Sequence, residues 1–224
     1  MLSSQISFAS ATSHSSKRTR DSESPKTIAY TTGLNAPKRT GKPSRDPFEV
    51  GLRTLMAILK IAQMGHPVLR QTADPIDPAG IAGPEVQHLI GEMYETMLDA
   101  DGAGIAAPQV HCPVRLVICT FDDGVAVLIN PEITPLSEDT VRSWEGCLSV
   151  KGMRAQVDRI AKIQLRYYDQ NGEHHERILE DWNAIVAQHE CDHLDGVLYI
   201  DRCDTTTLCF DAEFGRYHAA LGEE

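Results

Sequence analysis

Two histidines four residues apart constrain this chain more than any other feature. They flank a glutamate in His189-Glu190-Cys191-Asp192-His193, inside a helical pattern of apolar residues that runs from Asp181 to Gly196. Residues four apart share one face of a helix, so both imidazoles can reach one metal ion while Glu190 contacts its bound water. The H-E-x-x-H pattern therefore predicts a helix that carries a hydrolytic metal site; a surface helix that merely exposes these side chains is the alternative.

A catalytic metal site usually has three protein ligands and one open position, so a third ligand must come from elsewhere in the chain. The extended metzincin pattern fails, because Tyr199 stands where that pattern requires histidine. Two interpretations remain open at this point. The third ligand is either a downstream acid, Asp211 or Glu213, or an upstream thiolate, Cys147, whose flanking glycine lets the backbone approach a ligand closely.

The first 55 residues differ in composition from the rest of the chain. They contain 17 Ser or Thr and carry a formal charge of +5, whereas the whole chain carries −11 and the remainder therefore −16. Such a stretch without apolar periodicity is typical of disorder, and its Ser-rich, basic start is also typical of a transit peptide. Translation from Met56 is a third alternative. We expect residues 1–55 to be a disordered or targeting extension and residues 56–221 to form the catalytic domain.

Composition also excludes several classes of protein. The apolar runs, such as residues 125–129, are far too short to cross a bilayer. The net negative charge argues against a binder of nucleic acid, which normally presents a basic face. No secretory signal is recognisable, so the six cysteines are expected to be reduced thiols or metal ligands rather than disulfides.

The periodicity after residue 56 predicts an α+β domain. Apolar residues at three- and four-residue steps indicate an amphipathic helix from Pro84 to about Gly102, and β-branched runs follow. The expected strands cover residues 114–119, 125–129, 160–168 and 176–180, and a hairpin turn is expected at residues 171–172. We expect short mixed or antiparallel sheets around a central helix that bears H-E-x-x-H. An N-terminal helix and a short C-terminal helix over residues 205–219 complete the predicted fold.

Three motifs of the chain resemble those of the peptide deformylases. They are G-A-G-I-A-A-P-Q at residues 102–109, E-G-C-L-S at residues 145–149 and Q-H-E-C-D-H-L at residues 188–194, in the order and spacing of that family. The similarity extends from residue 60 to residue 202. The glycine-rich motif alone would be weak evidence, but three independent motifs are together highly specific.

The resemblance implies a metal site and its chemistry. Cys147, His189 and His193 are expected to hold one divalent metal ion, with water as the fourth ligand. Iron(II) is the usual metal of the family, while zinc, nickel or cobalt can occupy the same site. The bound water attacks the N-formyl group of formylmethionine, Glu190 is the general base and acid, and formate is released. Gln109 and the Leu148 N–H are the implied oxyanion donors.

The resemblance also implies how a nascent formylmethionyl peptide binds. The peptide is expected to add as a strand beside the glycine-rich motif and the cysteine loop. The residues assigned to substrate binding are Gly102, Ala103, Gly104, Ile105, Gly146, Arg154, Ile185 and Val186. Ile185 and Val186 are also interpretable as ordinary core residues, and Arg154 as a surface group. The chain departs from many family members at residues 151–153, where Lys-Gly-Met replaces a proline and predicts a more flexible loop.

The remaining expectations concern the charged neighbours of the metal ligands and the partners, location and alternative functions of the protein. The resemblance implies an ion pair between Glu145 and Arg159, and Asp192 is expected to orient a neighbour of the metal ligands. The ribosome near its exit tunnel is a candidate partner; no membrane or specific nucleic acid is expected. Location is expected to be cytoplasmic, or organellar if residues 1–55 are a transit peptide. Two competing functions are a peptidase that uses Asp211 or Glu213 as third ligand, and a metal-free binding module.

Overall fold

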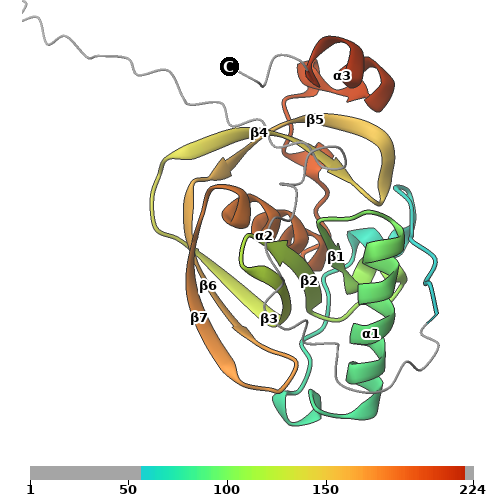
Figure 1. Ribbon diagram of the computed structural model, residues 1–224, viewed down its shortest axis with the longest axis vertical. Helices are drawn as coiled ribbons and strands as arrows, with labels where there is room; N and C mark the ends of the chain where they lie inside the picture. The colour runs from blue at the N-terminus through green and yellow to red at the C-terminus, as the bar shows by residue number, and fades with distance from the viewer. Residues whose placement is uncertain (1–56, 220–224) are drawn as a thin grey trace, which may run out of the picture.

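The computed structural model describes residues 57–219, and in it one helix lies between two antiparallel sheets (Figure 1). The larger sheet has the strand order β1-β2-β3-β6-β7, and the smaller has the order β4-β5-β8. The strands are β1 (Gly104–Ala106), β2 (Leu116–Phe121), β3 (Gly124–Pro135), β4 (Thr140–Cys147), β5 (Val150–Ile160), β6 (Lys162–Tyr168), β7 (His174–Glu180) and β8 (Cys209–Phe210). The helices are α1 (Pro84–Asp99), α2 (Asp181–Leu194) and α3 (Asp211–Tyr217).

Five short 3-10 segments connect these elements. They are η1 (Pro67–Arg70), η2 (Pro78–Gly80), η3 (Ala107–Val110), η4 (Tyr199–Asp201) and η5 (Thr205–Thr207). The predicted extension over residues 1–55, and Met56 as an alternative start, lie outside the described residues. No helix within residues 57–219 has the length and apolar character needed to cross a membrane.

Helix α1 follows the predicted amphipathic pattern. Its first residue is Pro84, whose fixed φ suits the first turn of a helix, and the helix ends three residues before Gly102. Ile90, Met93 and Met97 are almost fully buried and share one face. This face packs on β1 and β2 and forms a core with Ile118 and its neighbours in the sheet. The prediction of an N-terminal helix is confirmed.

Helix α2 is buried on its polar side as well as its apolar side. Ala184, Val186 and Leu194 pack into the core against the larger sheet. Glu190 and His193 are also buried, with 5% and 1% of their surface exposed. The helix contacts β1, β2, β5, β6 and β7 (Figure 1). Buried polar groups need partners, so the position of α2 forces its histidines and acids to bind other residues or a ligand.

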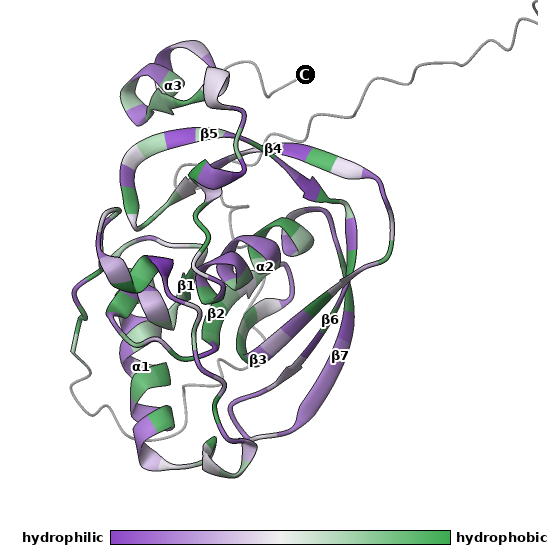
Figure 2. Ribbon diagram, turned by 180° about the vertical axis from the view of Figure 1, so that it is seen from behind, coloured by the Kyte–Doolittle hydropathy of each residue, from purple (hydrophilic) through white to green (hydrophobic). Residues whose placement is uncertain are grey.

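The larger sheet shows why its strands were predictable. In β6, Ile163, Leu165 and Tyr167 alternate inward and are buried, as their spacing predicts. The hairpin at residues 171–172 is also confirmed, since β6 and β7 pair in register across it. Figure 2 shows the contrast between the interior strand β2, which is coloured hydrophobic, and the edge strand β7, which is coloured hydrophilic.

Two sequence predictions are wrong. Residues 151–153 do not form a flexible loop, because they belong to β5; Gly152 there adopts φ +83°, a conformation that glycine reaches without steric cost. The C-terminal helix begins at Asp211 rather than at Thr205. The preceding residues form η5 and then β8, where Cys209 and Phe210 pair with β5. Pairing with the exposed edge of β5 overrides the local helical pattern.

Gly196, which follows α2, provides a test of the fold. Its φ is +72°, and a Cβ there would lie 2.8 Å from the backbone carbonyl carbon of Arg70. We expect Gly196→Ala to lower the free energy of unfolding by about 2–4 kcal/mol, from left-handed strain and overpacking. The matched control is Gly215→Ala in α3, where no atom lies within 4 Å of the added Cβ. Urea denaturation measures both, and an unchanged midpoint for Gly196→Ala would contradict this packing.

Candidate metal centre

One thiol and two imidazoles converge beside α2. Cys147, His189 and His193 each offer a ligand atom, and these atoms all lie within 4.8 Å of one another. The Cys147 Sγ and the His193 Nε2 are 3.3 Å apart. His189 and His193 are one helical turn apart on α2, as their spacing predicts, whereas Cys147 arrives from the end of β4. The structure therefore brings together the three residues that the sequence suggested as ligands.

The end of β4 is shaped to aim Cys147 at the helix. The β4–β5 ladder runs in register to Gly146 and Arg154 and then shifts, so that Cys147 pairs with Val150 across a tight turn. Such an irregularity redirects a side chain at the end of a strand. The Ser149 N–H then donates to the Cys147 Sγ at 3.4 Å, which stabilises negative charge on the sulfur.

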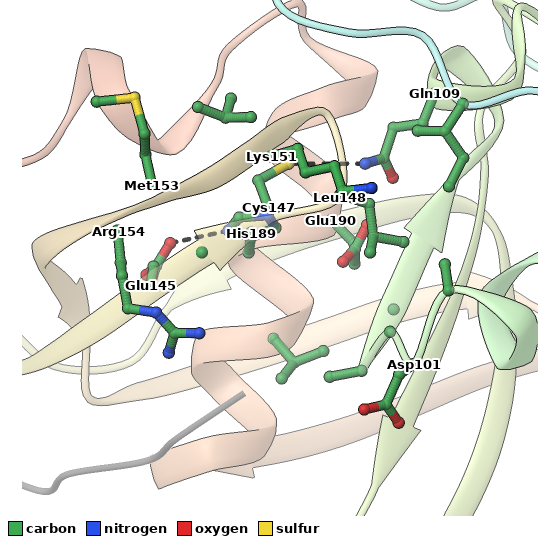
Figure 3. Close-up of a pocket in the computed structure, with 18 of the residues that line it drawn as sticks. Asp101, Gln109, Glu145, Cys147, Leu148, Lys151, Met153, Arg154, His189 and Glu190 are labelled. Atoms are coloured by element: carbon green, nitrogen blue, oxygen red, sulfur yellow. Dashed lines mark hydrogen bonds and ion pairs between the residues drawn. The ribbon is translucent and has the colours of Figure 1, made fainter. Parts of the chain in front are cut away.

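Glu145 fixes the orientation of His189. The Glu145 carboxylate lies 2.8 Å from His189 Nδ1 (Figure 3), an arrangement in which Nδ1–H donates and Nε2 keeps its lone pair for a metal. Arg159 donates to both oxygens of Glu145, at 2.7 and 2.9 Å, so the predicted ion pair is confirmed. Burial alone would raise the pKa of Glu145, but the hydrogen bonds from Arg159 and His189 lower it to about 2.

Glu190 lies beside the trio without a fixed partner. Its Oε2 is buried and has no hydrogen-bond partner among the described residues. Burial raises the pKa of this carboxyl to about 7. A Cβ on Gly104 would lie 2.5 Å from Glu190 Oε1, so only glycine leaves room for the carboxylate against β1. A buried carboxyl with one unpartnered oxygen, beside three ligand atoms, is chemically suited to hold and release a proton.

Gln109 is held so that its amide NH₂ faces Cys147. The Ala106 N–H donates to Gln109 Oε1 at 2.8 Å, which orients the amide. Gln109 Nε2 then lies 3.6 Å from Cys147 Sγ (Figure 3) and 3.2 Å from Ser149 Oγ. Leu148 occupies the turn between β4 and β5, and its carbonyl accepts a hydrogen bond from the Gln63 side chain at 3.0 Å.

A cavity of about 630 Å³ opens at these residues. It is lined by Gln109, Cys147, Leu148, His189 and Glu190, and by seven of the eight residues expected to bind substrate. Ile105 is the exception, because its side chain is fully buried in the core with α1. β1 is nevertheless the edge strand of the larger sheet within residues 57–219, next to β2.

The cavity also contains residues that the sequence did not single out. The segment before η1 contributes Ile58, Leu59 and Gln63, and α2 contributes Trp182. None of these lies in the three motifs quoted above, and the tertiary fold is what places them beside the ligands. Glu145 was predicted as a partner of Arg159 but not of His189. The general need of a ligand histidine for an oriented partner was a signal that could have found this contact.

The downstream acids considered as third ligands have other partners. Asp211 accepts a hydrogen bond from Arg154 at 2.6 Å, and Glu213 pairs with Arg216 at 3.0 Å. Within residues 57–219, neither belongs to a group of three potential ligands that converge. The Tyr199 ring stacks on His189 with centroids 6.2 Å apart.

A second group of potential ligands lies at the β6–β7 turn. It consists of Asp169, Glu173 and His175. Asp169 already accepts backbone N–H bonds from Asn171 and Glu173 at 2.9 Å. These hydrogen bonds stabilise the turn between β6 and β7, and they explain why the three side chains lie close together.

A divalent metal fits the first group. Thiolate and imidazole are ligands that several divalent transition metals accept, and three protein ligands leave an open position. Glu190 borders the same cavity, where a water on such a metal would need a proton acceptor.

Known proteins are similar in sequence to this chain over most of the described residues. A family model described as polypeptide deformylase matches residues 58–208. A protein of Leptospira biflexa named peptide deformylase is 44% identical over 164 residues, which cover 68% of this chain and 92% of the relative. A Pseudomonas aeruginosa protein of the same name is 40% identical over 153 residues, which cover 67% of this chain and 89% of the relative.

Solved structures of peptide deformylases are also similar to this chain. The crystal structure of peptide deformylase from Thermotoga maritima is similar with a TM-score of 0.63 and 38% identity, covering 65% of this chain and 99% of that one. A class I type b peptide deformylase from Acinetobacter baumannii bound to Met-Ala-Ser has a TM-score of 0.63 and 33% identity. The match covers 66% of this chain and 99% of that one.

Cobalt binding tests the ligand set. We expect Cys147→Ala to lose stoichiometric Co²⁺ binding and its thiolate-to-metal absorption, because one of three ligands is removed. Cys203→Ala, outside the group, should bind one Co²⁺ as the original chain does. Asp211→Asn and Glu213→Gln should also retain the ion. Full occupancy in Cys147→Ala together with loss in Glu213→Gln would show that the downstream acid is the ligand.

Proposed function

The chain belongs to the polypeptide deformylase family, metal-dependent enzymes that remove the N-formyl group from nascent peptides, and we propose the roles of its own residues in that reaction. Cys147, His189 and His193 hold the metal ion. When bound, a divalent ion there acidifies water and polarises the formyl carbonyl. The observation that carries the proposal is Glu190, whose buried Oε2 has no hydrogen-bond partner among the described residues, beside three convergent ligand atoms.

We assign Fe²⁺ as the native metal, in line with the family resemblance. One thiolate and two imidazoles also suit Zn²⁺, Ni²⁺ and Co²⁺, so the donor set narrows the choice to soft or borderline transition metals. Glu145 supports this role for His189, because its hydrogen bond to Nδ1 leaves Nε2 as the donor. Metal analysis of protein purified without oxygen identifies the ion.

Glu190 moves the protons of the reaction. Its carboxylate takes a proton from the attacking water as the new C–O bond forms at the formyl carbon. It then gives that proton to the leaving nitrogen as the C–N bond breaks. The products are formate and a peptide with a free methionine amino group, so atoms and protons balance without another reactant. The space left by Gly104 allows the carboxylate to approach this position.

Gln109 and Leu148 stabilise the negative charge that develops on the formyl oxygen. The Gln109 NH₂ is oriented beforehand by the Ala106 N–H, so no reorganisation is needed when charge appears. The Leu148 N–H lies one residue after Cys147, in the turn that borders the cavity. Two donors placed in advance beside the ligands are what hydrolysis of an amide requires.

The peptide binds as an added strand. β1 is an edge strand and borders the cavity through Gly104, while Gly146 and Arg154 border it from β4 and β5. An extended peptide can hydrogen-bond to such an edge without regard to its sequence. Ile185 and Val186 supply an apolar surface for the methionine side chain. The relative crystallised with Met-Ala-Ser supports a tripeptide of this kind as the probe.

We propose further that residues 56–221 act as one catalytic domain and that the enzyme works on peptides emerging from the ribosome. The basic residues 1–55 or α3 would provide contact with the ribosome. The same basic segment is proposed as an organellar address; without such a role the enzyme acts in the cytoplasm. Sedimentation with ribosomes at low salt, before and after deletion of residues 1–55, tests the contact, and equal sedimentation removes the segment from this role.

Replacement of the proton carrier tests the function. Release of formate from formyl-Met-Ala-Ser is expected from iron-loaded protein without oxygen. Glu190→Gln should lower kcat by about 10²–10⁴-fold, because the amide cannot accept the proton. Glu213→Gln, on exposed α3, is the matched control and should release formate at the original rate. No release by the original iron-loaded protein would contradict the proposed function.

Replacement of the oxyanion donor tests its role separately. Gln109→Leu should lower kcat by about 10²–10³-fold while one Co²⁺ still binds, since a charge-stabilising donor is lost but no ligand is. Gln164→Leu is the control, because the Gln164 amide binds Glu176 across the β6–β7 hairpin and does not line the cavity. A kcat for Gln109→Leu within threefold of the original would show that Gln109 is not the donor.

A further inference from the structure

A surface arginine is connected to a proposed metal ligand through four successive side-chain contacts. Arg202 follows η4 and its side chain is half-exposed, with 49% of its surface accessible. Its Nε and Nη2 donate to the two carboxylate oxygens of Asp192, at 2.7 and 2.8 Å. This two-point contact fixes the carboxylate plane, which a single ionic contact does not.

The contacts continue inward from Asp192. Asp192 Oδ2 also accepts a hydrogen bond from Arg159 Nη1 at 2.6 Å. The other nitrogens of Arg159 bind both oxygens of Glu145, and Glu145 binds His189 Nδ1. The path therefore runs through α2, β5 and β4 and ends on α2 at the imidazole. Arg159 stands between two carboxylates that compete for its hydrogen bonds.

The charges explain why the outer arginine matters. Glu145, Asp192 and Arg159 are buried, with 4%, 8% and 3% of their surface exposed. Two buried carboxylates against one buried guanidinium leave an excess negative charge, which is costly away from water. Arg202 supplies the second positive charge and occupies both oxygens of Asp192. Without it, Asp192 would draw Arg159 toward itself and away from Glu145.

We propose that Arg202 is a positioning residue of the metal centre. By holding Asp192, it keeps Arg159 on Glu145, which in turn keeps the His189 Nε2 directed at the metal. The inference rests on the proposed metal site, because it assigns a support to one of that site's ligands. Indirect supports of a ligand histidine typically change metal affinity by about 10–100-fold.

The test compares two arginines with similar contacts. Arg202→Met removes the guanidinium and keeps an unbranched apolar side chain in place of the arginine stem. Arg142→Met is the matched control, because Arg142 also makes a two-point contact with an aspartate, Asp158, at 2.9 and 2.7 Å, and is 41% exposed. Arg202→Lys restores the charge without the two-point contact. Co²⁺ affinity by chelator competition and the Co²⁺ absorption spectrum are measured for each purified protein.

We expect Arg202→Met to bind Co²⁺ about 10-fold more weakly, with a changed ligand-field spectrum and a lower kcat at unchanged KM. Arg202→Lys should lie between it and the original protein, and it decides the matter if Arg202→Met does not fold. Arg142→Met should match the original in affinity and spectrum.

Affinities of the Arg202 variants within twofold of the original, or an equal loss in Arg142→Met, would overturn the inference while leaving the metal site intact. If the original protein binds no Co²⁺ with a thiolate signature, the metal site itself is wrong and the inference falls with it.

Discussion

The buried contact between Glu145 and Arg159 is the constraint on which the rest of the site depends. It joins β4 to β5, and through His189 it joins both strands to α2. A buried ion pair often contributes little net stability because desolvation offsets attraction, whereas loss of one partner leaves an unpaired buried charge. We therefore attribute the role of this pair to orientation rather than to stability. It fixes the His189 imidazole and holds β4, the strand whose end carries Cys147.

Much of the fold could be predicted from the sequence because local pattern and tertiary environment agree. Local sequence determines three of these features: the apolar face of α1, the turn at Gly172, and the alternation of Ile163, Leu165 and Tyr167 in β6. The ladder of β4 and β5 was missed because burial alternates there, but small or polar residues such as Ser143, Glu145 and Arg159 occupy inward positions where strand prediction expects apolar ones. The start of α3 depends on pairing with β5, which no local pattern contains.

The candidate site likewise contains some residues that the sequence pattern predicts and others that only the tertiary structure brings together. The helical spacing of His189 and His193 was sufficient to place both on one face, and the motif around Cys147 suggested the third ligand. The contact of Glu145 with His189, the position of Arg202 and the contribution of Leu59 to the cavity depend on residues distant in the chain. Asp211, which sequence reasoning left open as a ligand, binds Arg154 instead because α3 packs on β5.

X-ray absorption at the metal edge tests the central claim most directly. In the protein loaded with one equivalent of Zn²⁺, the account predicts one sulfur at about 2.3 Å and two imidazole nitrogens at about 2.0–2.1 Å, with a light-atom ligand in the fourth position. The sulfur should disappear in Cys147→Ala. A shell of oxygen and nitrogen alone in the original protein would contradict the assignment of Cys147, His189 and His193 as the metal ligands.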